Sequence, residues 1–237
     1  MSAGEGTGTD QGEREPAGPG SMDELEAAAA RRSEALISAV AELARRLHDL
    51  GAVQFGEFTL KSGAKSPVYV DLRLLASDPA VLRDAARAYA VLLAGLEFDR
   101  IAAIPYAGVP IGTAVSLETG RPMIYPRKEV KAYGTGRAVE GLHAEGETAV
   151  VLDDLISSGG SKLEAIEPLE DAGLVVRDVV VLIDRQGGGA EELAAAGYRL
   201  HSVMTLIDVA AALAAEGRIS PEQRDAVEKY VRESTAK

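Results

Sequence analysis

The sequence contains no cysteine, which excludes disulfide cross-links and thiol chemistry and is compatible with a reducing compartment. Its three histidines (His48, His143 and His201) lie far apart and lack the spacing of metal ligands. Lys and Arg number 25 against 37 Asp and Glu, and this net charge of -12 argues against a surface that coats nucleic acid. No apolar stretch is long enough to span a bilayer, and no signal peptide is visible. We therefore expect a cytoplasmic protein that binds neither nucleic acid nor membranes.

The chain is long enough to bury one good core, and a single domain is expected over residues 21–237. Residues 1–20 contain six glycines, two prolines and no large apolar side chain after Met1, a composition that predicts a disordered tail. Within the domain we expect a small N-terminal hood at about 36–75 and a core at about 76–237.

From residue 100 onward, the hydrophobic pattern predicts strands and helices in alternation. The expected strands are 101–104, 123–125, 149–152, 175–183 and 200–206. The expected helices among them are 109–118, 162–172 and 190–195, followed by two C-terminal helices. Such alternation is typical of an α/β fold in which a mostly parallel sheet is flanked by helices on both faces.

The strongest local pattern is VVLDDLISSGGS, residues 150–161. An apolar run predicts a buried strand, and the two carboxylates of Asp153 and Asp154 follow where that strand is expected to end. The small residues after them let several backbone N–H groups converge on one phosphate at a helix N-terminus. Because carboxylates repel phosphate, this acidic pair (Asp153 and Asp154) must serve hydroxyl groups or a cation beside it. The pattern favours a phosphorylated sugar with a diol, accompanied by Mg²⁺, over an ordinary strand–helix turn with solvated aspartates.

This order of residues resembles the phosphoribosyl-pyrophosphate (PRPP) signature of the type I phosphoribosyltransferases. In that family the two acidic residues bind the ribose 2′ and 3′ hydroxyls, and the following loop binds the 5′-phosphate. The resemblance implies a type I phosphoribosyltransferase-like fold with a small N-terminal hood. It also implies a set of PRPP-binding residues: Asp153, Asp154, Leu155, Ile156, Ser157, Ser158, Gly159, Gly160 and Ser161.

Residues 57–73, EFTLKSGAKSPVYVDLR, resemble the substrate hood of the orotate phosphoribosyltransferase family. The resemblance places Lys61, Tyr69 and Val70 at the orotate site, with Val70 where an aromatic residue is often found. A surface hairpin with a solvated lysine is the alternative.

The resemblance adds Ser157 and Arg185 to the orotate site. Arg185 follows a buried strand, and its fixed fork of donors suits a planar carboxylate. An ion pair between Asp184 and Arg185 at the strand end is the alternative.

Residues 104–116, IPYAGVPIGTAVS, resemble the pyrophosphate-binding loop of the same family. Tyr106 and Ala107 occupy its contact positions, and some relatives carry a lysine at the position of Ala107. Alone, the stretch is also compatible with a plain Gly/Pro turn.

Residues 125–141, YPRKEVKAYGTGRAVEG, concentrate positive charge in an otherwise acidic chain, and we call them the basic loop. Their glycines and lack of apolar periodicity predict a mobile segment that could close over a polyanion. The loop resembles the family's catalytic loop, which implies that Arg127, Lys128 and Lys131 bind the pyrophosphate. Tyr133 stands where many relatives have a histidine. A solvated charged loop is the alternative.

Together these stretches predict an orotate phosphoribosyltransferase, a pentosyltransferase that makes orotidine 5′-monophosphate and pyrophosphate from orotate and PRPP. The implied catalytic residues are Lys131, Lys128, Arg127, Asp153 and Asp154. No residue is expected to ligate Mg²⁺ directly, since PRPP would carry the ion near the acidic pair. The resemblance also implies a homodimer with shared active sites, and the length suggests a form without a decarboxylase barrel. A phosphoribosyltransferase for another nucleobase and a PRPP-sensing regulator remain the alternatives.

Overall fold

The computed structural model describes residues 38–59, 63–128 and 138–235. The expected tail at residues 1–20 and the predicted site residues Lys61, Lys131 and Tyr133 lie outside these ranges. No helix within the described ranges is long and apolar enough to cross a membrane.

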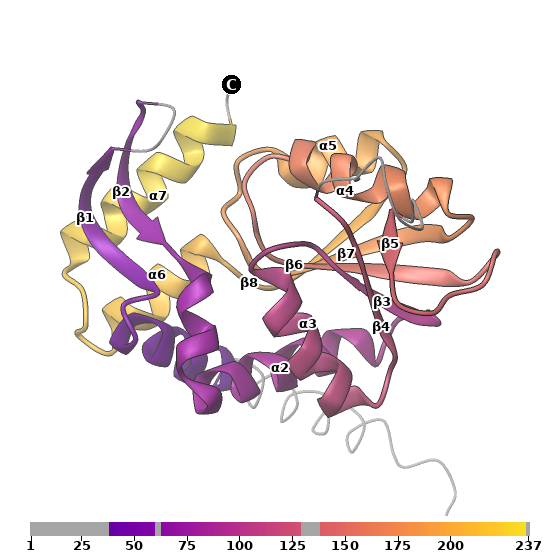
Figure 1. The fold of residues 1–237 in the computed structure, drawn as a ribbon. Helices are drawn as coiled ribbons and strands as arrows, with labels where there is room; N and C mark the ends of the chain where they lie inside the picture. Colours follow the sequence, from indigo (N-terminus) through magenta and orange to yellow (C-terminus); the bar gives the residue numbers. More distant parts are fainter. Residues whose placement is uncertain (1–37, 60–62, 129–137, 236–237) are drawn as a thin grey trace, which may run out of the picture. The chain divides into compact units, whose positions relative to one another are not determined.

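A six-stranded sheet forms the centre of the fold, in the order β5-β4-β3-β6-β7-β8 (Figure 1). The strands in that order are β5 (Val139–Glu140), β4 (Met123–Pro126), β3 (Arg100–Ala103), β6 (Thr148–Ile156), β7 (Val175–Asp184) and β8 (Arg199–Thr205). Neighbours are parallel except for β4 and β5, which are antiparallel. From the central pair, the chain proceeds outward from β3 to β4 on one side and from β6 to β7 on the other. The loops after β3 and β6 therefore diverge, and a crevice is expected at their carboxyl ends.

Helices cover both faces of this sheet, as predicted from the sequence. Helices α2 (Pro79–Leu93) and α3 (Gly108–Thr119) lie on one face, and α4 (Gly160–Asp171) and α5 (Gly189–Ala195) lie on the other (Figure 1). The strands supply both cores because successive side chains point to opposite faces. Val150 packs in the same core cluster as α2 and α3, whereas Val151 packs in the cluster of α4 and α5.

The hood is an antiparallel hairpin of β1 (Val53–Thr59) and β2 (Lys65–Val70). The C-terminal helix α7 (Pro221–Thr235), which follows α6 (Leu206–Ala215), packs against β2 (Figure 1). Ser220 caps the start of α7: its hydroxyl accepts the Gln223 N–H at 3.3 Å, and its own N–H donates to Gln223 Oε1 at 2.9 Å. A segment that the sequence assigned to the core therefore supports the hood.

Two local features differ from the sequence prediction. Strand β6 does not end at Leu152 but continues through the acidic pair to Ile156, because Asp153, Leu155 and Ile156 pair with strand β7. A short 3-10 helix, η1 (Leu72–Ser77), follows the hairpin, where no helix was predicted. Both features fix the backbone on either side of the predicted sugar site.

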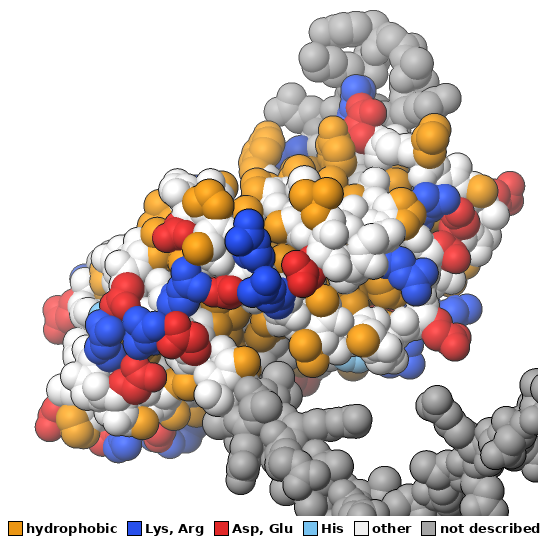
Figure 2. All heavy atoms as spheres, turned by 90° about the horizontal axis from the view of Figure 1, so that it is seen from below, with side chains coloured by type: hydrophobic (Ala, Val, Ile, Leu, Met, Phe, Trp, Pro, Cys, Tyr) orange, Lys and Arg blue, Asp and Glu red, His pale blue; other side chains and the backbone are white. Residues whose placement is uncertain are grey.

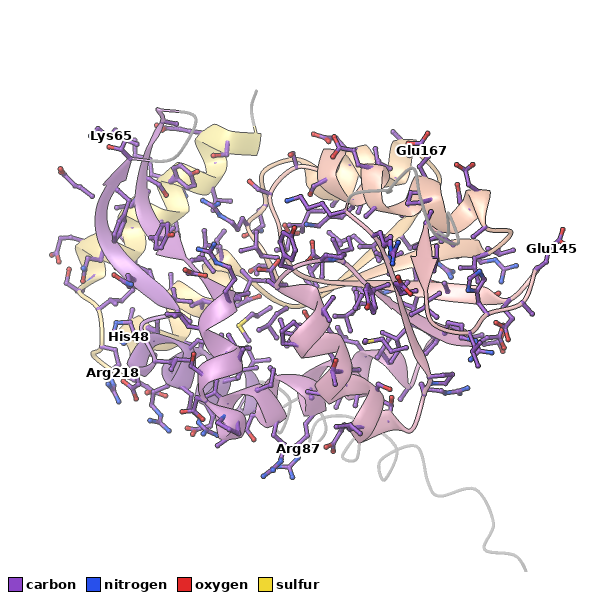
Figure 3. The ribbon with its side chains drawn as sticks, in the orientation of Figure 1. His48, Lys65, Arg87, Glu145, Glu167 and Arg218 are labelled. Carbon is purple, nitrogen blue, oxygen red and sulfur yellow. The ribbon has the colours of Figure 1, made fainter. Side chains whose placement is uncertain are left out.

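The surface formed by α2 and its neighbours carries interleaved charges (Figure 2). Ion pairs on it join Arg45 to Glu42 and Asp49, Arg218 to Asp49, Arg46 to Asp84, and Arg87 to Asp84 and Glu118. Figure 3 shows Arg87 extending away from the sheet, with Glu167 of α4 on the opposite side of it. Exposed pairs of this kind contribute little to stability.

Candidate active site

Asp153 is 7% exposed and has protein partners for its whole carboxylate. Its Oδ1 accepts the Asp154 N–H at 2.9 Å, and its Oδ2 lies 2.6 Å from Lys162 Nζ. The hydroxyl of Tyr89, a fully buried residue of α2, donates to the Asp153 carbonyl at 2.6 Å. Asp153 is therefore held from two helices as well as by its own strand. No spacing in the sequence connects Tyr89 or Lys162 with this residue.

Asp154 is half-buried and less fully engaged. Its Oδ1 accepts the Leu155 N–H at 2.8 Å. Burial, and then the neighbouring charge of Asp153, raise the pKa of Asp154 to about 7. Carboxylates with such a raised pKa are concentrated at functional sites.

Arg73, at the end of the hood stretch, lies near the acidic pair, and sequence reasoning did not place it there. Its guanidinium is paired with Asp71 at 2.6 Å and lies close enough to Asp154 and Tyr69 for both to raise the pKa of Arg73 further. Arg73 is the last residue of the hood stretch at 57–73, and this position was the one feature of the sequence that could have indicated its proximity to the acidic pair.

The phosphate loop, residues 157–161, leads directly into α4, with Gly159 as the residue before the first helical turn. A second loop packs beneath it: Gly189 N–H donates to the Ser157 carbonyl at 3.1 Å. A Cβ on Gly187 would lie only 2.7 Å from the same carbonyl oxygen, so the close approach requires glycine there. The contacts with Ser157 therefore give a structural reason for the run of three glycines at residues 187–189, to which the sequence analysis assigned no role.

The carboxylate of Glu192 in α5 accepts the Gly159 N–H of the phosphate loop at 2.8 Å. The Glu192 carboxylate therefore accepts from the Gly159 N–H, one of the backbone donors that were predicted to bind the 5′-phosphate. Glu192 was not recognised from the sequence because it comes from the next helix along the chain.

The pyrophosphate loop after β3 lies against the acidic pair. A Cβ on Gly108 would be 3.0 Å from the Leu152 carbonyl oxygen and 3.2 Å from Asp153 Oδ1, so glycine is what permits this approach. Tyr106 is 70% exposed, and its ring lies 4.9 Å from Lys128 Nζ, a cation–π distance. Two residues predicted from separate stretches are therefore neighbours.

Arg127, Lys128 and Ser161 line one cavity of about 290 Å³ between β4 and α4. Arg127 also donates through Nε to Glu140 Oε1 at 2.5 Å, a partner on β5 that was not predicted. The structure thus brings the first two cations of the basic loop to the end of the phosphate loop.

On the orotate side, Tyr69 is 38% exposed and its ring lies 5.6 Å from that of Phe58, whereas Val70 is half-buried and packs against the core. Arg185 donates its backbone N–H to the Ile156 carbonyl at 2.8 Å, and its Nε is buried without a hydrogen-bond partner among the described residues.

The alternative ion pair between Asp184 and Arg185 is absent from the described part of the chain, where the Asp184 carboxylate accepts the Gln186 N–H at 2.7 Å. The side chain of Ile156 is fully buried, which leaves only its backbone for a ligand.

Comparison with known proteins identifies this arrangement. A protein from Cenarchaeum symbiosum described as orotate phosphoribosyltransferase is 39% identical over 190 residues, which cover 78% of this chain and 95% of that protein. This chain belongs to the orotate phosphoribosyltransferase family. Its fold is accordingly that of the type I phosphoribosyltransferases.

Two further members of the orotate phosphoribosyltransferase family show how far the likeness extends. The crystal structure of orotate phosphoribosyltransferase from Aeropyrum pernix matches with a TM-score of 0.64 and 35% identity, over 74% of this chain and 98% of that one. The bifunctional enzyme PyrF/PyrE of Nostoc sp. is 43% identical over 182 residues, 77% of this chain. The chain spans 38% of the length of that bifunctional relative. No protein-family model matches the chain.

Proposed function

We propose that the protein transfers the 5-phosphoribosyl group of PRPP to orotate, giving orotidine 5′-monophosphate and pyrophosphate in pyrimidine (UMP) biosynthesis. The observation that carries this proposal is the meeting of an acidic pair, a glycine-rich phosphate loop and Lys128 at the carboxyl ends of β3, β4 and β6. Membership of the family supports the choice of orotate.

Cleavage of the bond at ribose C1 develops positive charge on the sugar and negative charge on the departing pyrophosphate. Preorganised charges stabilise such a transition state without covalent participation of the protein. In the proposed site, Arg127 and Lys128, with Lys131, bind the pyrophosphate. The phosphate loop binds the 5′-phosphate and the acidic pair binds the ribose, so that C1 is held against orotate N1.

The proposed substrate is PRPP with Mg²⁺ bound to it. Mg²⁺ requires nearly octahedral oxygen ligation and commonly combines one or two carboxylates with substrate phosphates and water. The described residues include no group of three or more His, Cys, Asp or Glu side chains suited to a metal. PRPP and water would therefore ligate the ion, which would lie near the acidic pair. Such an ion would offset negative charge on the pyrophosphate.

The test is to follow orotate absorbance in the presence of PRPP and Mg²⁺, with adenine and uracil as competing bases. PRPP-dependent loss of orotate, with formation of orotidine 5′-monophosphate, supports the proposal. Consumption of adenine or uracil instead would indicate a phosphoribosyltransferase for another nucleobase. PRPP binding without turnover of any base would indicate a regulator.

We further propose a homodimer in which the basic loop of each subunit completes the partner's site, as the resemblance of residues 125–141 suggests. Lys131→Ala and Asp154→Ala should each be nearly inactive. If they are refolded together, half of the dimers should be mixed, and each mixed dimer should contain one site with neither defect. Activity should then recover to roughly a quarter of wild type. No recovery in a mixture that contains heterodimers by mass would show that Lys131 serves its own subunit.

A further inference from the structure

Lys162 is the one buried lysine in the described part of the chain, with 4% of its surface exposed. Lysine is almost never fully buried unless its charge is paired. The residue follows the phosphate loop immediately, in the first turn of α4, where a lysine on the outer face would be solvated. Its burial at this place therefore calls for a specific partner.

That partner is the acidic pair. Lys162 Nζ lies 2.6 Å from Asp153 Oδ2 and donates to Ser161 Oγ at 3.4 Å. The ammonium group thus lies between Asp153 and the last residue of the phosphate loop. It connects the proposed ribose site with the proposed 5′-phosphate site from beneath.

The contact makes the two aspartates unequal. In Asp153, Oδ1 accepts the Asp154 N–H and Oδ2 is paired with Lys162, so both oxygens have strong protein donors. In Asp154, Oδ1 accepts the Leu155 N–H, the side chain of Asp153 lies within hydrogen-bonding reach, and no Lys, Arg or His among the described residues forms an ion pair with the carboxylate. A ribose hydroxyl that donates a hydrogen bond needs a carboxylate that is not already paired with a cation, as is the case for Asp154 and not for Asp153.

We propose that Lys162 is a positioning residue that fixes Asp153 as its counter-ion and thereby leaves Asp154 as the carboxylate presented to the ribose hydroxyls of PRPP. This assignment rests on the proposed function and divides a pair that the resemblance treats as equivalent. Lys162 touches neither orotate nor the bond that breaks, so it acts through Asp153.

Loss of the ammonium group would leave two adjacent, poorly solvated carboxylates facing each other. Like charges in such a site repel, and a buried charge without its partner is strongly unfavourable. Asp153 would turn toward the nearest donors or cations, which are those meant for PRPP. The effect should fall on PRPP and not on orotate, which is held by other residues.

The experiment compares Lys162→Met, which keeps the length of the side chain but not its charge, with the charge-balanced double variant Asp153→Asn/Lys162→Met. Asp154→Asn and Lys229→Met are measured alongside; Lys229 is a lysine of α7 whose side chain is 72% exposed. KM and kcat are determined separately for PRPP and orotate, PRPP binding is measured by calorimetry, and circular dichroism checks folding.

Lys162→Met should raise KM for PRPP by ~10-fold or more and change KM for orotate by less than ~2-fold. The double variant should have a lower KM for PRPP than either Lys162→Met or Asp154→Asn, because the neutral amide that replaces the Asp153 carboxylate needs no counter-ion. Asp154→Asn should remain defective by ~10-fold or more even though its fold is intact. Lys229→Met should behave as wild type.

An unchanged KM for PRPP in Lys162→Met would overturn the proposal, as would a double variant as defective as Asp154→Asn. If Lys162→Met does not fold, the comparison of the double variant with Asp154→Asn decides alone. Absence of orotate turnover in the wild type would count against the proposed function, while calorimetry with PRPP would still test Lys162 separately.

Discussion

The protein uses ion pairs in two contrasting places, beneath the phosphate loop and on the α2 surface. The side chains of Lys162 and Asp153 are 5% and 9% exposed. Those of Arg87 and Asp84 on the α2 surface are 60% and 30% exposed, and their closest charged atoms are 3.6 Å apart. Water screens the second pair and solvates either partner when the other is removed. Lys162 and Asp153 are buried, so water cannot solvate the charge that would remain if one of them were removed.

The same chemical pairing therefore has different consequences in the two regions. We expect the α2 surface to tolerate the loss of one partner, because several arginines and acids there share neighbours. The buried pair depends on both members, and it lies next to residues that are proposed to bind substrate. We expect the pairing of Lys162 with Asp153 to matter mainly because it keeps Asp153 from being an unpaired buried charge next to the proposed substrate.

The largest expected effect is on the buried pair. Lys162→Met should lower the free energy of unfolding by ~3–5 kcal/mol, because Asp153 becomes an uncompensated buried charge. Urea denaturation measures the change, and Asp153→Asn/Lys162→Met should recover most of it. Equal stability of the single and double variants would show that the pair is not electrostatically coupled.

Asp154→Asn separates binding from folding at the same place. It should lower turnover by at least ~10-fold, equivalent to a hydrogen bond of ~1.4 kcal/mol, while far-ultraviolet circular dichroism stays that of the wild type. Steady-state kinetics with saturating orotate checks the first expectation. Near-normal turnover would contradict the assignment of Asp154 to the ribose.

The raised pKa of Asp154 also predicts how stability depends on pH. The pKa is about 7 in the folded protein and 3.8 for an ordinary aspartate, so between these values the folded state holds a proton that the unfolded state releases. Stability of the ligand-free protein should therefore fall as the pH rises from about 4 to about 7. Thermal midpoints across this range should fall less steeply in Asp154→Asn. Identical slopes in the two proteins would contradict the raised pKa of Asp154.

The smallest effect is expected on the α2 surface. Arg87→Ala should change the free energy of unfolding by less than ~1 kcal/mol, because its contacts with Asp84 and Glu118 are exposed and longer than hydrogen bonds. Raising the salt concentration should reduce even this difference. A loss comparable to that of Lys162→Met would show that exposure does not separate the two regions.

The layers of the sheet were predictable because they depend on local periodicity. Continuous apolar runs at residues 149–152 and 179–183 indicated strands buried on both faces, and the structure confirms them within β6 and β7. The start of α2 also depends on local residues: Pro79 is its first residue, and the Asp78 carboxylate accepts the N–H groups of Ala80 and Val81.

The end of β6 was not predictable in the same way. Paired carboxylates disfavour a strand locally, yet the ladder with β7 extends the strand through Asp153 to Ile156. Pairing with a strand that is distant in the sequence, Asp153 with Val181, outweighed the local preference.

The sequence by itself determined the order of strands and helices, the pattern of residues 150–161 and the concentration of positive charge in the basic loop, since these follow from neighbouring residues along the chain. Only the tertiary structure decided the partners of those residues. Tyr89 reaches Asp153 from α2, Glu192 reaches Gly159 from α5, and α7 packs on the hood hairpin. Such contacts depend on how the helices pack on the sheet, and no local spacing encodes which side chains then meet.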